Sequence, residues 1–114
     1  MNAYKVAQFL IDNGLYSQMR YTGLAEAIKG HIKHKTLTVI GDIDAVARWN
    51  MDTTDVAYVI DVAVSKDKRF LKYLKLLIQK GMKRFPRTKY LRFERGLKGK
   101  KMKLVKVSRF IKEK

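Results

Sequence analysis

Asp61 is the residue whose position in this sequence points most directly to chemistry. It lies inside Val56–Val64, a segment that is otherwise apolar or aromatic and rich in β-branched residues. A carboxylate buried among such residues costs free energy unless it is paired or has a function. Two interpretations stay open: Asp61 is a general base or orienting acceptor, or it lies at a strand bulge or edge or is neutralised by a neighbour such as Arg48.

The two histidines, His31 and His34, are the next candidates for chemistry. They lie three residues apart in Gly-His-Ile-Lys-His-Lys. An imidazole suits acid–base catalysis because its pKa lies near neutrality, whereas the same pair at a frayed helix end also fits two solvated cations. We keep His31 as a candidate catalytic partner of Asp61. Two histidines and no cysteine fall short of the roughly three or four ligands of common zinc sites, so we expect no metal site.

The positive charge of the chain is concentrated in its second half. Residues 1–61 carry six basic and seven acidic side chains, whereas residues 62–114 carry twenty basic and three acidic ones, for a total of +16. A surface of this sign attracts nucleic acid, an acidic protein, a phosphate-bearing cofactor or anionic lipid. Lysines on a solvated face also serve solubility alone, and that alternative stays open.

Two segments of the second half suggest where an anion would bind. The turn 95–101 combines four cations with two glycines, a composition that directs backbone N–H and ammonium groups at phosphate. Tyr90, Phe93 and Phe110 alternate with cations as in single-strand binding platforms; the alternative is that Leu91, Phe93 and Phe110 face the core. The predicted nucleic-acid or anion-binding residues, including two lysines of a helix face, are Lys72, Lys75, Arg92, Arg95, Lys98, Lys100 and Lys101.

Hydrophobic periodicity predicts the elements that position these residues. We expect two helices in residues 1–35, three strands in 36–64, a long helix over 66–85 that Pro86 ends, and a hairpin in 88–111. The chain forms one domain of residues 1–114, long enough for a single core. The predicted class is α+β or mixed αβ, with a central, mostly antiparallel sheet, two N-terminal helices and one long crossover helix.

The sequence has no apolar segment of transmembrane length. Its longest apolar run, Val56–Ile60, is far shorter than the roughly 20 residues that span a bilayer. The N-terminus lacks the pattern of a secretory signal, and cysteine is absent. We therefore expect a soluble, cytoplasmic protein.

Several motifs resemble one enzyme family. These are Tyr58-Val-Ile-Asp-Val-Ala-Val64, Lys83-Arg-Phe-Pro86, Tyr90-Leu-Arg-Phe-Glu-Arg95 and Lys103-Leu-Val-Lys-Val-Ser-Arg-Phe110. They are similar to the toxin-activating lysine acyltransferases of the GNAT superfamily, over about residues 56 to 111. The resemblance implies a small GNAT-like fold with a site for an acyl donor, either acyl-coenzyme A or an acyl carrier protein. It also implies transfer of the acyl group to an amine acceptor.

The resemblance also implies roles for particular residues. In that family a strand aspartate works with a histidine to activate the acceptor lysine. Asp61 takes the aspartate's place, while neither histidine lies in a matching context. The glycine-rich donor loop of ordinary superfamily members is replaced by a segment without glycine. Residues implied for donor binding are the backbone groups of Val62 and Val64 and the cations at the helix start, Lys66, Lys68 and Arg69.

A second class of function stays open beside the enzyme. The same fold without catalysis would serve as a basic binding protein for nucleic acid or an acidic protein partner. Such a protein would act as a virion, phage accessory or inhibitor component. The cationic second half and the glycine-free donor loop favour this alternative.

Overall fold

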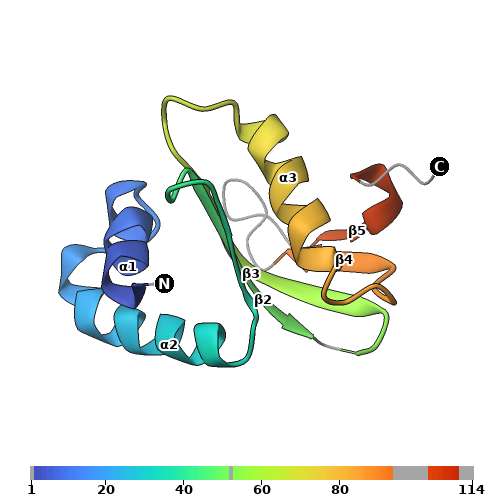
Figure 1. The fold of residues 1–114 in the computed structure, drawn as a ribbon, viewed down its shortest axis with the longest axis horizontal. Helices are drawn as coiled ribbons and strands as arrows, with labels where there is room; N and C mark the ends of the chain where they lie inside the picture. The colour runs from blue at the N-terminus through green and yellow to red at the C-terminus, as the bar shows by residue number, and fades with distance from the viewer. Residues whose placement is uncertain (1, 52, 94–102, 111–114) are drawn as a thin grey trace.

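The structure, a computed structural model, describes residues 2–51, 53–93 and 103–110. Within them it confirms the α+β class, with helices on both faces of a five-stranded sheet (Figure 1). The helices are α1 (Ala3–Asp12), α2 (Tyr21–Lys33) and α3 (Phe70–Met82), with short 3-10 turns η1 (Gln18–Arg20) and η3 (Val107–Arg109). The strands are β1 (Leu37–Ile40), β2 (Ala45–Met51), β3 (Val56–Val64), β4 (Tyr90–Phe93) and β5 (Lys103–Lys106).

The sheet follows the chain order β1-β2-β3-β4-β5 and is mostly antiparallel, as predicted. The exception is the β3–β4 pair, which is parallel from Val56 opposite Tyr90 to Val59 opposite Phe93. Parallel neighbours need a crossover connection, and α3 supplies it. Residue 93 is the last described residue of β4, so the described ladder ends two residues before Asp61.

Helices cover opposite faces of the sheet, and each covered face has its own core (Figure 1). The N-terminal core joins α1 and α2 to one face, and its members include Val6, Leu10, Leu24, Ile28, Leu37, Val39, Val46 and Ala63. The α3 core joins α3 to the other face, and its members include Ala47, Trp49, Ala57, Val59, Leu74, Leu77, Ile78 and Leu91.

A bulge in β3 decides which face Asp61 occupies. Arg48 lies opposite Asp61 and Trp49 lies opposite Val59, so Ile60 is an extra residue in β3. Alternate residues of a regular strand share a face, yet Val59 belongs to the α3 core and Ala63 to the N-terminal core. The bulge therefore moves the odd-numbered residues after Ile60 to the face that α1 and α2 cover.

The connection between β3 and α3 is longer than the sequence pattern indicates. The helix begins at Phe70 and ends at Met82, inside the expected range of 66–85. Ser65, the residue just before the expected helix, does not cap α3: its hydroxyl donates to Asp67 Oδ1 at 2.6 Å, its carbonyl accepts from Lys68 N, and Arg69 is the residue before the helix. These contacts form a turn before the helix, so the cations of this turn precede α3.

No helix in the described ranges is long and apolar enough to cross a membrane.

Candidate functional site

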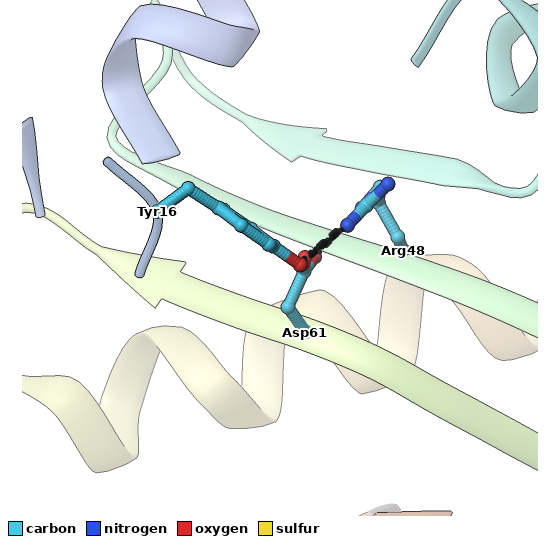
Figure 2. Close-up of polar contacts among 3 residues, drawn as sticks. All are labelled: Tyr16, Arg48 and Asp61. Carbon is cyan, nitrogen blue, oxygen red and sulfur yellow. Dashed lines mark hydrogen bonds and ion pairs between the residues drawn. The ribbon is translucent and has the colours of Figure 1, made fainter. Parts of the chain in front are cut away.

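Asp61 forms a buried ion pair with Arg48 of the neighbouring strand (Figure 2). The Arg48 Nε lies 3.0 Å from both Asp61 oxygens, and Nη2 lies 2.5 Å from Oδ2. The two side chains are only 7% and 4% exposed. This arrangement matches the interpretation in which Arg48 neutralises the Asp61 carboxylate. The bulge at Ile60 places Asp61 on the sheet face toward α1 and α2.

Tyr16 completes this cluster from the segment between α1 and η1 (Figure 2). Its hydroxyl donates to Asp61 Oδ2 at 2.6 Å and accepts from Arg48 Nη2 at 2.7 Å. Burial raises the pKa of Tyr16 to about 12, and the hydrogen bond to Asp61 and its negative charge act in the same direction. Tyr16 is therefore a protonated hydrogen-bond donor at neutral pH, and its phenol is unsuited to act as a base there.

His31 is affected by the charges of this cluster, but its hydrogen-bond partner is Thr36. Its Nδ1 is 2.6 Å from Thr36 Oγ1, whereas the hydrogen bonds to the Asp61 carboxylate come from Arg48 and Tyr16. Burial lowers the pKa of His31, and the positive charge of Arg48 lowers it further. The structure therefore pairs His31 with Thr36, and Asp61 lacks the histidine hydrogen bond that a His–Asp catalytic pair would use.

The residues implied for donor binding follow one another from the end of β3 into the turn before α3. Val62 and Val64 are half-buried, pack against the α3 core and pair with β2 at Ala47 and Ala45. Lys66 and Arg69 are exposed in the turn before α3, and Lys68 is half-buried.

The predicted anion-binding residues divide into described and undescribed ones. Lys72 and Lys75 are exposed on α3, and Arg92 is half-buried on β4 opposite Tyr58. Arg95, Lys98, Lys100 and Lys101 lie outside the described residues.

The aromatic residues of the second half do not form one platform. Phe93 and Phe110 pack against the α3 core, as the alternative interpretation of them holds. Tyr90 is half-buried and occupies the β4 position two residues before Arg92, so the two share a sheet face. Trp49 is buried in the α3 core, where its Nε1 donates to Thr38 Oγ1 at 2.9 Å.

Exposed cations recur every three residues around the start of α3. We name this set the α3 cation surface: Lys66, Arg69, Lys72 and Lys75. Two apolar side chains lie among them, Phe70 at 47% and Leu71 at 69% exposure. Asp67 is the acidic residue of this segment, and its carboxylate accepts the Ser65 hydroxyl. This surface is exposed, positive and partly apolar, unlike the buried Arg48–Asp61 pair.

Tyr16 is the site residue that sequence reasoning missed. It follows Gly14-Leu15 in a connection without a periodic pattern, and its partner Asp61 is 45 residues away. No local signal in the sequence indicates that contact. Among the described residues, no group of three or more His, Asp or Glu side chains is arranged to hold a metal ion.

Comparison of the chain with protein-family models, with curated proteins and with solved structures finds no match.

Proposed function

We propose that this protein binds single-stranded nucleic acid through the α3 cation surface. The observation that carries the proposal is that these cations are exposed and form no ion pair with another described residue. In the described ranges, the two ion pairs are Lys29–Glu26 and Arg48–Asp61, both in the first half of the chain. Cations in this state release counterions from a phosphate backbone when they bind it.

The spacing of the cations suits a nucleic-acid strand. Arg69, Lys72 and Lys75 recur every three residues, which places them on one side of the helix and its first turn. A helix rises about 1.5 Å per residue, so Lys72 and Lys75 are separated by roughly 4.5 Å along the axis. Cations repeated along one side of a helix form a positive track, which is the feature that proteins use to follow the backbone of a single strand.

The exposed apolar side chains favour a single strand over a duplex. Phe70 is 47% exposed beside Arg69, so its ring is accessible to a base. Proteins that bind single strands combine a cationic track with aromatic rings on which bases stack. A duplex, whose bases are already stacked, would leave Phe70 and Leu71 without a partner.

The test measures the affinity of the full chain for a fluorescent oligothymidine by anisotropy over a range of salt concentrations. In Lys72→Glu/Lys75→Glu we expect the affinity to fall about tenfold or more. The slope of log affinity against log salt should become shallower by about 0.7 for each phosphate that the variant no longer neutralises.

The matched control is Lys5→Glu/Lys33→Glu, because both lysines are exposed in the first half and the change in net charge is the same. We expect this control to keep most of the affinity. Equal losses in the two variants would mean that net charge alone drives binding. Absence of binding at low salt would end the proposal.

A second candidate function is acyl transfer, and the topology around Asp61 favours it. Parallel β3 and β4 are joined by α3, and Asp61 lies on β3. The resemblance to lysine acyltransferases supports the same candidate. Against it stands the geometry of Asp61, whose hydrogen bonds come from Arg48 and Tyr16.

The two candidates differ in their ligands. For acyl transfer, calorimetric titration should show binding of acetyl-coenzyme A or of an acyl-loaded carrier protein. That binding should weaken in Lys66→Glu/Arg69→Glu and persist in Lys5→Glu/Lys33→Glu. If neither donor binds the wild-type chain, the acyltransferase candidate fails while nucleic-acid binding is unaffected.

A further inference from the structure

A cleft of about 770 Å³ opens at the end of the sheet where β3 and β4 begin and β5 ends. Three separate segments of the chain line it: the residues before β3, the connection from α3 to β4, and the end of β5 with η3. The lining residues that matter here are Thr54, Asp55, Arg87, Thr88, Lys89 and Lys106. The cleft lies apart from Asp61 and from the α3 cation surface, none of whose residues line it.

The lining carries more positive than negative charge. Arg87, Lys89 and Lys106 are exposed cations, and they come from two different segments. The carboxylate in the lining is Asp55, which accepts the Thr54 hydroxyl at 2.9 Å. A cleft with three cations and one carboxylate favours an anion that also carries hydroxyl groups, since a carboxylate accepts hydrogen bonds from them.

Thr88 provides an independent sign of a ligand. It lines the cleft and is 7% exposed, and its Oγ1 is buried without a hydrogen-bond partner in the part of the chain that the structure describes. Its backbone is engaged, because Thr88 N donates to Phe85 O at 3.1 Å. Buried hydroxyls are nearly always hydrogen-bonded, so an orphaned one between Arg87 and Lys89 needs an acceptor.

We propose that this cleft binds a phosphate monoester of nucleotide size. The phosphate would lie among Arg87, Lys89 and Lys106, and Thr88, turned about its Cα–Cβ bond, would donate its hydroxyl to it, while Asp55 would accept sugar hydroxyls. The volume lies within the range of small-molecule sites, about 300–1,000 Å³. This inference does not rest on nucleic-acid binding by α3, because it uses other residues.

Such a phosphate has two sources, a free nucleotide and the 5′ end of a strand. The test titrates the full chain by calorimetry with inorganic phosphate, adenosine monophosphate, and an oligonucleotide with or without a 5′-phosphate. We expect saturable binding of adenosine monophosphate, tighter than that of phosphate. A gain of about tenfold or more from the 5′-phosphate identifies the strand end, and its absence identifies the free nucleotide.

The decisive variants separate the cleft from α3. In Arg87→Gln/Lys106→Gln we expect the dissociation constant for adenosine monophosphate to rise about tenfold or more. The control Lys72→Gln/Lys75→Gln removes the same charge from the α3 cation surface. It should change the dissociation constant for adenosine monophosphate less than about twofold. Thr88→Val should raise the same dissociation constant about threefold to tenfold. Its melting temperature should not fall, because the change removes an unpaired buried hydroxyl.

Three results would overturn the proposal. The first is no saturable binding of adenosine monophosphate or phosphate by the wild-type chain. The second is an equal loss in the cleft variant and the α3 control. The third is unchanged affinity in Thr88→Val, which would remove the hydroxyl from the site. Failure of oligothymidine binding alone would leave the cleft standing, because that assay tests α3.

Discussion

At the scale of single residues, the cluster of Tyr16, Arg48 and Asp61 connects the N-terminal segment to the sheet. Arg48 and Asp61 belong to β2 and β3, and Tyr16 follows α1. Burying an ion pair costs several kcal/mol of desolvation, which is recovered only with good geometry and further hydrogen bonds. The two-pronged contact of Arg48 and the Tyr16 hydroxyl provide both. The cluster therefore joins the segment between α1 and η1 to β2 and β3 through hydrogen bonds.

Removing one charge from this pair should cost much more than removing both. Asp61→Asn leaves Arg48 buried without a counterion, and we expect the free energy of unfolding to fall by about 3–5 kcal/mol. Arg48→Met/Asp61→Leu should recover most of that loss, because no unpaired charge remains. Urea unfolding measures both variants.

The matched control is the exposed pair Lys29–Glu26, whose side chains are 48% and 61% exposed. Glu26→Gln should change the free energy of unfolding by less than about 1 kcal/mol. An equal loss in the single and double variants at Arg48 and Asp61 would contradict the argument from unpaired charge.

Tyr16 should make stability depend on pH in the alkaline range. Its pKa in the folded protein is about 12, against 10.0 for the unperturbed phenol. Since the folded state holds this proton more tightly, its contribution is fully present below pH 10 and is lost as pH rises through 12. Urea unfolding between these pH values should show a steeper decline for the wild type than for Tyr16→Phe. Parallel curves for the two proteins would show that Tyr16 does not contribute the slope.

At the scale of elements, the sequence predicts those parts that depend on local pattern. The apolar, β-branched run 56–64 forms β3, and the helical period after residue 66 forms α3. The bulge at Ile60 has no such signal, because Val59, Ile60 and Asp61 also fit a regular strand. The contact of Tyr16 with Asp61 joins residues 45 apart, and no local pattern encodes it. The sequence thus identifies Asp61 as unusual. It does not predict the sheet face on which Asp61 lies or its contact with Tyr16.

Two helical glycines should respond oppositely to alanine. A Cβ at Gly81 of α3 would lie 3.0 Å from Trp49 Cζ2, and that ring is buried and held by its hydrogen bond to Thr38. A Cβ at Gly30 of α2 would meet nothing within 4 Å. Alanine favours a helix by up to about 1 kcal/mol relative to glycine at both positions.

We therefore expect Gly30→Ala to be more stable than the wild type. Gly81→Ala should be less stable than Gly30→Ala by about 1–3 kcal/mol, the usual cost of overpacking a core. Thermal unfolding followed by circular dichroism measures both. Equal stabilisation by the two changes would mean that α3 moves away from Trp49 without cost.

At the scale of the whole molecule, the cations of the second half have two uses. Some stabilise the fold: Lys80 Nζ donates to Val39 O at 2.7 Å, and Arg84 Nη1 donates to Lys35 O at 3.1 Å and to Leu37 O at 3.3 Å. These contacts cover carbonyls in and just before the edge strand β1. Others, including those of the α3 cation surface, face solvent, and a net charge of +16 repels itself in the compact state.

This repulsion predicts that anions stabilise the protein in two distinguishable ways. Raising sodium chloride from about 20 to 200 mM shortens the screening length from roughly 20 to 7 Å, so the melting temperature should rise by a few degrees. Tripolyphosphate at equal ionic strength should raise it by about 4 °C more, because an anion bound to the folded state adds its binding free energy. The extra rise should shrink in Lys72→Gln/Lys75→Gln and in Arg87→Gln/Lys106→Gln. Equal responses to chloride and tripolyphosphate would mean that the charge is only screened, and that neither surface binds phosphate.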